Sequence, residues 1–465
     1  MRVLDLNDKR FWKMILRFGL PIAIQNLIFN SLTLVDNILI GGLGDTHIAA
    51  VGVANKLTFI FSIFLFGVNS GANIFSAQFW GKKDLKGVRM VLGLSLMLSI
   101  GVAVPFAFLG ILAPRFIVDI FSNDPEVIRQ GASFLGIMAC SYPISAVTSS
   151  FSIQSRGVGR TKVPLVASSI ALAVNTCLGY ILIYGKLGMP MMGIRGAAVA
   201  TLVARVLECF ILLGIIYWKK YELAARLSDF KGYTSDFLLR FIKPVSPVII
   251  NELIWSIGVS GYTYFYGVLG TEAVATVQIL DVINGMFFSL FMGLGNACGA
   301  VIGNLIGARE EDTAKVYAKR CVVVGVGMAL VVSVALLLTA PLFLGFFNIS
   351  AETFEICKKT IMVYAAYMVP KMINMIIIVG VCRGGGDTIF SMIIDAGAPW
   401  IIGLPMAYLG VRVLALPVFL VMAMINLEEI VKGILGIMRL ISGKWLHNLV
   451  YDFSHDEEEL ESSIA

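Results

Sequence analysis

Twelve long apolar stretches divide the chain, and their length constrains the fold more than any other feature. They fall at about residues 15–40, 49–80, 88–112, 130–153, 163–185, 196–217, 241–267, 277–306, 319–346, 361–381, 389–410 and 415–438. A helix needs roughly 20 mostly apolar residues to cross a hydrocarbon core of about 30 Å. Only 14% of the residues are charged, against about 25% in soluble proteins. The sequence therefore predicts an all-α membrane protein with twelve transmembrane helices.

The basic residues give the orientation. With a cytoplasmic N-terminus, 25 of the 36 lysines and arginines lie on the inner side and seven on the outer side. Cytoplasmic loops are enriched in Lys and Arg, so we expect both termini in the cytoplasm and the protein in the plasma (inner) membrane. The net charge of +6 reflects this topology, not nucleic-acid binding. We expect the acidic tail from Asp456 to Glu461 to be disordered, and Asn348-Ile349-Ser350 is a formal glycosylation sequon on the outer side.

The second half of the chain repeats the first. Pro21–Gly44 has the same length as Pro247–Gly270, at an offset of 226 residues, and SRGVGRT at 155–161 matches CRGGGDT at 382–388, at an offset of 227. Each half holds six spans, so the halves share one orientation and are related about an axis along the membrane normal. We predict two pseudo-symmetric six-helix lobes around a central cavity, an arrangement that suits alternating-access transport. The predicted domains are residues 1–218, a linker at 219–240, residues 241–440 and a tail at 441–465.

Histidine and cysteine patterns argue against an enzyme. The three histidines, His47, His447 and His455, lie in a predicted outer loop and the tail, and the seven cysteines form no CxxC pair. A zinc site needs a cluster of such ligands, and a catalytic triad needs a buried histidine. We expect no cofactor and no certain metal site.

Several strings together identify a family. They are GLPIAIQNLIFNSLTLVDNILIGGLGD and FGVNSGANIFSAQFWGKKD in the first two spans, NTCLGYILIYG and GIRGAAVAT in spans 5 and 6, PVSPVIINELIW in span 7, and the RG-x-G-x-T turn that both halves share. The set resembles the multidrug and toxic compound extrusion (MATE) family over about residues 15 to 440. The resemblance implies two six-helix lobes that export organic cations and amphipathic drugs in exchange for Na⁺ or H⁺. We expect the protein to work as a monomer.

Asp36 is the first candidate site residue. It lies in span 1 on one face with Gln25, eleven residues earlier, next to a stripe of asparagines. A charge inside a span is costly and is a functional candidate by default, although a structural role stays open. The resemblance implies that Asp36 is the key acid of a cation site in the N-terminal half.

The resemblance also implies partners for Asp36. The matching positions in spans 5 and 6 hold Asn175, Ala197 and Thr201, but the family's second acid is replaced by Gly179. One carboxylate makes a weaker Na⁺ cage and a sufficient proton carrier, so Na⁺ binding here is open to question.

Glu252 is the matching candidate in the C-terminal half. It shares a face of span 7 with Trp255 and Tyr262, and a buried acid beside aromatic rings could receive an organic cation by charge and cation–π attraction. The resemblance places an acid of the C-terminal half here, and Glu252 could trade a proton for a cationic drug. The alternative is a structural pair with Lys371 on span 10. A Na⁺ ion is possible at Asp36 or at Glu252.

Further charges leave their roles open. The family's acid in span 10 would fall at Met372, which is uncharged, with Lys371 next to it. For Lys371, Asp281 on span 8 and Asp395 on span 11, a structural pair and a functional role are equally open.

Two pairs lie along single helices. Arg205 and Glu208 on span 6 are three residues apart, and Glu428 and Lys432 on span 12 are four apart. These spacings let charges pair on one helix, so we interpret both pairs as structural.

The preferred function is a cation-coupled antiporter. A flippase for lipid-linked oligosaccharides is the alternative within transport, but its cavity is commonly strongly basic, and here only Lys371 and Lys56 offer positive charge within the spans, against at least four acids. A membrane enzyme would need a metal or phosphate site, and a passive channel would show no accumulation driven by an ion gradient.

Overall fold

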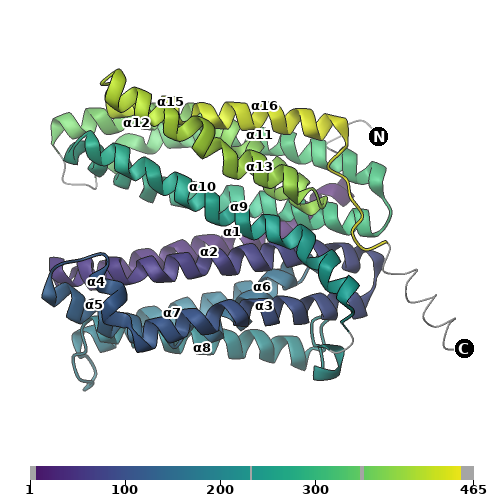
Figure 1. The fold of residues 1–465 in the computed structure, drawn as a ribbon, viewed down its shortest axis with the longest axis horizontal. Coiled ribbons are helices and arrows are strands. Elements are labelled where there is room, and N and C mark those ends of the chain that lie inside the picture. The colour runs from purple at the N-terminus through teal and green to yellow at the C-terminus, as the bar shows by residue number, and fades with distance from the viewer. Residues whose placement is uncertain (1–6, 231–232, 346–349, 452–465) are drawn as a thin grey trace, which may run out of the picture. The chain divides into compact units, whose positions relative to one another are not determined.

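The protein is built from helices that run side by side (Figure 1). This computed structural model describes residues 7–230, 233–345 and 350–451, and within these ranges it has helices and one isolated β-bridge. The predicted acidic tail from Asp456 to Glu461 and the first two residues of the sequon lie outside the described residues. The all-helical prediction is confirmed.

The chain divides into two compact units. One unit holds Ile24–Phe241, and the other holds the residues up to Ala23 together with those from Ile242 onward. We call the first the N-half unit and the second the C-half unit. The division falls inside the first helix, shortly after Pro21, whereas the predicted domain limits at 218, 240 and 440 stay predictions.

Six spans belong mainly to the N-half unit. Its helices are α1 (Lys9–Gly41, whose first part belongs to the C-half unit), α2 (Asp45–Lys82), α3 (Leu85–Leu112), α4 (Pro114–Asp119), α5 (Pro125–Ala139), α6 (Tyr142–Gly157), α7 (Lys162–Tyr184), α8 (Ile194–Trp218) and the short η1 (Leu227–Phe230). Helices α5 and α6 form one span that is bent by 49°.

Six more spans make up the C-half unit, and three of them contain breaks. The elements are α9 (Ser235–Val268), α10 (Thr271–Gly307), α11 (Glu311–Leu344), α12 (Ala351–Asn374), η2 (Met375–Arg383), α13 (Thr388–Ala398), η3 (Pro399–Gly403), α14 (Leu404–Tyr408), η4 (Leu409–Val413), α15 (Val418–Ile425) and α16 (Leu427–Ser442). The segments η2, η3 and η4 are π-helical, a form that is frequent at functional sites.

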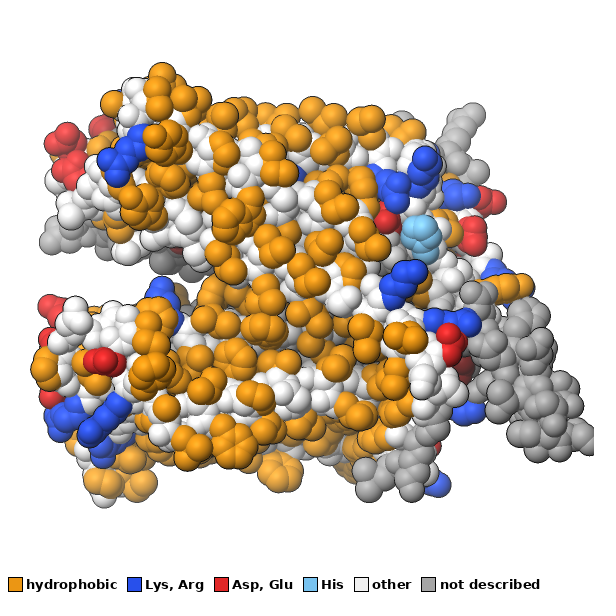
Figure 2. Space-filling view, viewed as in Figure 1, with side chains coloured by type: hydrophobic (Ala, Val, Ile, Leu, Met, Phe, Trp, Pro, Cys, Tyr) orange, Lys and Arg blue, Asp and Glu red, His pale blue; other side chains and the backbone are white. Residues whose placement is uncertain are grey.

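The helices have the length and surface of membrane spans. In the described part of the chain, nine helices are long and apolar enough to cross a membrane, and the bent pair α5–α6 makes ten. The remaining two of the twelve predicted spans are α9, which carries charged residues and two prolines, and the broken pair α15–α16. Figure 2 shows apolar side chains over the middle of the visible face and charged ones towards its two ends. Such a surface suits a lipid environment.

Close backbone packing brings η2 against α10. A Cβ atom on Gly384 would lie 2.6 Å from the carbonyl oxygen of Gly299, so a larger residue would force the two segments apart. The π-helical turns and this approach fix the position of Arg383, the last residue of η2.

Polar contacts anchor the start of α1 within the C-half unit. The carboxylate of Asp8 caps the helix by accepting from the backbone of Arg10 at 2.9 Å. It also accepts from Arg320 at 2.6 Å and from the hydroxyl of Tyr317 at 3.0 Å. Burial raises the pKa of Asp8, but the hydrogen bonds from Phe11, Arg320 and Tyr317 outweigh burial and hold this pKa below its usual value.

Candidate functional site

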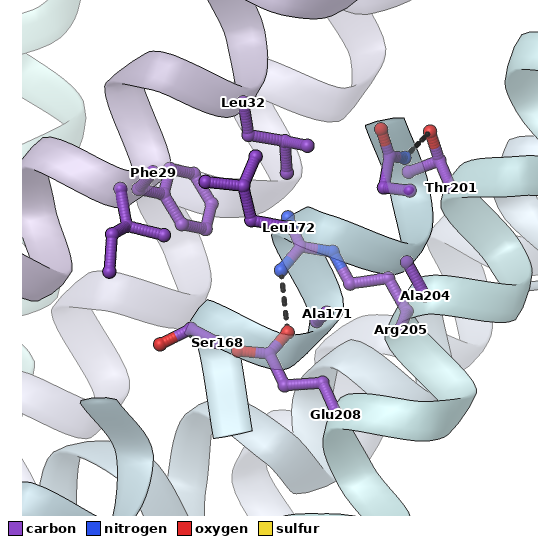
Figure 3. A pocket seen from close by; sticks show the side chains of 11 residues that line it. Phe29, Leu32, Ser168, Ala171, Leu172, Thr201, Ala204, Arg205 and Glu208 are labelled. Atoms are coloured by element: carbon purple, nitrogen blue, oxygen red, sulfur yellow. Dashed lines mark hydrogen bonds and ion pairs between the residues drawn. The ribbon is translucent and has the colours of Figure 1, made fainter. Parts of the chain in front are cut away.

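A small pocket in the N-half unit lies between α1, α7 and α8 (Figure 3). Its lining consists of Ile28, Phe29, Leu32, Ser168, Ala171, Leu172, Asn175, Thr201, Ala204, Arg205 and Glu208. The amide nitrogen of Asn175 donates to the hydroxyl of Thr201 at 3.0 Å, and that hydroxyl donates to the carbonyl of Ala197 at 3.0 Å. The structure thus brings together three of the residues that the resemblance implied.

Asn175 leaves one strong acceptor unused. Its side chain is fully buried, and its Oδ1 atom has no hydrogen-bond partner among the residues that the structure describes. Buried polar atoms are nearly always satisfied, so an orphan carbonyl of this kind points to a water molecule or a cation. We call Asp36, Asn175, Ala197, Thr201 and Arg205 the N-half site.

Asp36 stands apart from this hydrogen-bonded group. It is half-buried on α1 and is not among the residues that line the pocket. Within the described ranges, no hydrogen bond or ion pair is found for its carboxylate, and Arg205 is the cation that acts on it through space. Arg205 itself pairs with Glu208 at 2.9 Å, as the spacing predicted. At Gly179, a Cβ would meet only Leu39 and Ala200, at 3.5 and 3.8 Å.

The C-half unit holds a denser set of charges. Glu252 on α9 pairs with Arg383 at 2.7 Å, and both side chains are largely buried. The partner suggested by sequence, Lys371, does not pair with it. Instead, the ammonium of Lys371 lies 4.1 Å from the centre of the Tyr364 ring. The sequence placed Arg383 in a turn on the inner side, and periodicity could not show that η2 would carry it to Glu252.

Asp395 links this pair to the last span. Its carboxylate lies 3.8 Å from Arg383 and 3.7 Å from Lys432, and it accepts a hydrogen bond from Asn251 at 3.0 Å. Asp395 therefore connects α9, η2, α13 and α16.

Lys432 on α16 is surrounded by carboxylates. The predicted contact with Glu428 is present at 3.9 Å, but Glu429 is closer, at 3.3 Å. Glu429 also accepts from the amide of Asn374 at 2.6 Å, and Glu428 accepts from the hydroxyl of Tyr262 at 2.6 Å. The pair on one helix is thus part of a larger network. We call Glu252, Arg383, Asp395, Glu428, Glu429 and Lys432 the C-half cluster.

Three predicted residues have other surroundings. Tyr262 was expected to act with Glu252 but contacts Glu428. Trp255 is half-buried, and Asp281 is exposed and interacts with Lys371 through space. Across residues 7–230, 233–345 and 350–451, neither Trp255 nor Asp281 makes a hydrogen bond or an ion pair.

Sequence reasoning missed several members of the cluster. Glu429, Asn251 and Asn374 were not singled out, although each is a polar residue inside an apolar window and so carried the same signal as Asp395. The count of positive charge within the spans was also too low, because Arg383 and Lys432 are both buried.

The charges of the cluster do not balance. Its four carboxylates face two cations, and Lys371, on the neighbouring α12, raises the cations to three. One negative charge is left over when every group is ionised. No group of three or more His, Cys, Asp and Glu side chains arranged to hold a metal ion is found in the described chain.

Known proteins share this sequence and this fold. The family model described as MatE matches residues 21–181 and 247–409. A probable multidrug resistance protein NorM from Thermotoga maritima is 24% identical over 435 residues, which are 93% of each chain, and an uncharacterized transporter YisQ from Bacillus subtilis is 24% identical over 433 residues, which are 92% of this chain and 93% of the other.

Solved structures have the same architecture. The outward-facing structure of a multidrug resistance MATE family transporter superposes with a TM-score of 0.83 at 21% identity, covering 93% of this chain and 96% of the other. A superfamily transporter from Pyrococcus furiosus, whose title suggests a different function from a reversed polarity of its binding pocket, also gives 0.83, at 22% identity with the same coverage. The predicted twelve-helix, two-lobed fold is therefore confirmed.

Proposed function

Since the chain belongs to the MATE family of multidrug efflux transporters, we propose that it exports organic cations or amphipathic drugs in exchange for H⁺ or Na⁺ by alternating access. The single observation that carries this proposal is the uncompensated negative charge of the C-half cluster. A cationic substrate is attracted to such a site, and an anionic one is repelled.

The same charge provides a basis for exchange. A net charge inside a membrane protein is costly, so the cluster is most stable when one positive charge neutralises it. A proton, an alkali ion or an organic cation can each supply that charge. Two such cations together would leave an uncompensated positive charge, so binding of one favours release of the other. Competition of this kind, joined to alternating access, is sufficient for antiport.

The N-half site offers a second place for the coupling ion. Asp36 supplies a carboxylate without an ion-pair partner in the described chain, and Asn175 supplies a buried carbonyl oxygen without a hydrogen-bond partner there. One carboxylate is enough to carry a proton, and a Na⁺ ion would need further oxygen ligands, for which water is a source. We propose that Asp36 carries the coupling ion of this half.

Gradient-driven efflux from liposomes tests the function. The purified protein is reconstituted with a fluorescent organic cation, and efflux is followed first under an imposed pH gradient and then under an imposed Na⁺ gradient. We expect one gradient to drive transport against the concentration of the cation, and collapse of that gradient to stop it. Efflux that ignores both gradients would instead indicate a passive channel.

A flippase for lipid-linked oligosaccharides is the second candidate. Arg383 and Lys432 add positive charge beyond what the sequence suggested, but they lie against carboxylates. The excess of acid disfavours an anionic pyrophosphate-linked cargo. Scrambling of a labelled lipid-linked sugar in the same liposomes, without cation efflux, would favour this candidate.

We propose that the protein resides in the plasma membrane as a monomer with both termini in the cytoplasm. The distribution of basic residues supports this topology. Labelling of single cysteines placed near each terminus with a membrane-impermeant reagent, in intact and in opened cells, tests the orientation.

A further inference from the structure

Lys432 occupies the centre of the last-span carboxylates. Its ammonium lies 3.3 Å from Glu429, 3.7 Å from Asp395 and 3.9 Å from Glu428, and only 3% of the residue is exposed. These oxygens come from two segments, α13 and α16. A buried lysine in such a place is a fixed cation that cannot leave the site.

Other groups around Lys432 leave it as the charge that the three carboxylates share. Arg383 on η2 is committed to Glu252 on α9 at 2.7 Å, and it lies 3.8 Å from Asp395. Lys371 on α12 acts on Lys432 through space but lies over the ring of Tyr364. From α9, the hydroxyl of Tyr262 faces Glu428 as a neutral donor.

A compact ammonium and a bare alkali ion make the same demand on such a site. Both are single positive charges that need several oxygen atoms and partial neutralisation by carboxylates when water is removed. Two cations within a few ångströms of each other in a buried site repel strongly. A site that already contains an ammonium therefore has no place for Na⁺ beside it.

We propose that Lys432 is a built-in cation that takes the place of Na⁺ in the C-half cluster, so that this half exchanges protons for organic cations. The inference rests on the proposed function and specifies its coupling ion. A proton from water binds a carboxylate oxygen of the cluster and forms an O–H bond, which cancels the one excess negative charge. When an organic cation enters, that bond breaks and the proton returns to water, so the total charge stays the same.

Na⁺ binding to the purified protein tests the inference without any transport. The full chain carries Asp36→Asn, which removes the candidate carboxylate of the N-half site. Thermal unfolding in detergent micelles is compared in NaCl, KCl and choline chloride at equal ionic strength. With Lys432 in place, we expect the three salts to give the same midpoint. Lys432→Gln in this background should gain a stabilisation that saturates with Na⁺ and that K⁺ and choline do not reproduce.

Two control variants separate position from total charge. Lys432→Arg keeps the cation and should stay insensitive to Na⁺. Lys371→Gln removes a buried lysine that lies on an aromatic ring and not among the three carboxylates. This variant should gain no Na⁺ response, and an equal gain in Lys371→Gln and Lys432→Gln would overturn the inference.

Two further outcomes also overturn it. One is a folded Lys432→Gln protein that Na⁺ does not stabilise. The other is binding of radioactive Na⁺ to the protein that retains Lys432, abolished by Glu429→Gln. If Lys432→Gln does not fold, this second measurement decides alone, and absence of Na⁺ binding supports the inference. Failure of these binding tests leaves cation export intact, and failure of gradient-driven export leaves the Na⁺ measurements valid.

Discussion

The two halves of the chain use equivalent arginines in different ways. Arg156 in the N-half unit corresponds to Arg383 in the C-half unit, at the offset of 227 residues. Arg156 donates to the neutral amide of Gln25 at 2.9 Å, whereas Arg383 pairs with the carboxylate of Glu252 at 2.7 Å. The repeat has kept the arginine and changed the charge of its partner.

The coupling candidates differ in the same manner. The offset of 226 residues carries Asp36 onto Tyr262, so the half that has an acid here has few other charges, and the other half has a hydroxyl that donates to Glu428. Carrying the offset of 227 further places Arg205 opposite Lys432. Arg205 pairs with one acid on its own helix, whereas Lys432 lies among three. A symmetric fold therefore supports one sparse and one dense arrangement of charge.

The largest effect is expected from the sparse half. Asp36→Asn removes the acid of the N-half site and leaves its size unchanged. We expect gradient-driven efflux from liposomes to fall to the level of protein-free liposomes, with unchanged expression and unfolding midpoint, because no ion pair is lost. Wild-type efflux by this variant would mean that coupling depends on the C-half cluster alone.

Stability should separate the two arginines. Arg383→Gln leaves Glu252 as a buried charge without its closest cation, a change that costs about 3–5 kcal/mol. Arg156→Gln removes a bond to a neutral amide and should cost about 1–3 kcal/mol. Reversible unfolding in mixed micelles measures both. Adding Glu252→Gln to Arg383→Gln should recover part of the loss, and equal losses for the two single variants would contradict the comparison.

The fold was predictable because each span writes its own signal. Hydrophobic length and the repeat of prolines and glycines located the spans, and the pairs Arg205–Glu208 and Glu428–Lys432 follow from helical spacing alone. Contacts between spans were not predictable in this way. The pairing of Glu252 with Arg383 depends on the π-helical turns of η2 and on the close approach at Gly384, which no periodicity in one sequence reveals.

A third test concerns which acid of the dense half exchanges the proton. Sequence reasoning favoured Glu252, but Arg383 lies 2.7 Å away and holds its charge. Glu428 has a neutral donor, Tyr262, and shares Lys432 with two other acids. We expect Glu428→Gln to weaken binding of an organic cation about tenfold, or 1.4 kcal/mol, at high pH and to have little effect at low pH. Glu252→Gln should give the same loss at every pH.

Affinity measured against pH for both variants and the wild type decides between the two acids. At low pH the wild-type Glu428 already carries a proton, so replacing it with glutamine changes little. A pH-independent loss for Glu428→Gln, together with a pH-dependent loss for Glu252→Gln, would return the exchange to Glu252.

The smallest effects are expected at the exposed ion pairs, where the two units resemble each other. Arg10 pairs with Glu310 at 2.8 Å in the C-half unit, and Arg160 pairs with Glu222 at 2.7 Å in the N-half unit. The first pair has side chains 55% and 36% exposed, and the second 35% and 13%. Exposed pairs contribute about 0.2–1 kcal/mol, so Glu310→Gln should fall near the lower limit and Glu222→Gln near the upper.

The pH dependence of the Glu310 pair has a definite sign. The hydrogen bond from Arg10 lowers the pKa of Glu310 in the folded protein. A lowered carboxylate pKa stabilises the fold above the unfolded value, about 4.3, and this stabilisation is lost as the pH falls through the folded pKa. The difference in unfolding free energy between wild type and Glu310→Gln should therefore be constant near neutral pH, shrink below about pH 4 and also shrink in high salt. A difference that grew on acidification would show that Glu310 is stabilised in its protonated form and that Arg10 is not its effective partner.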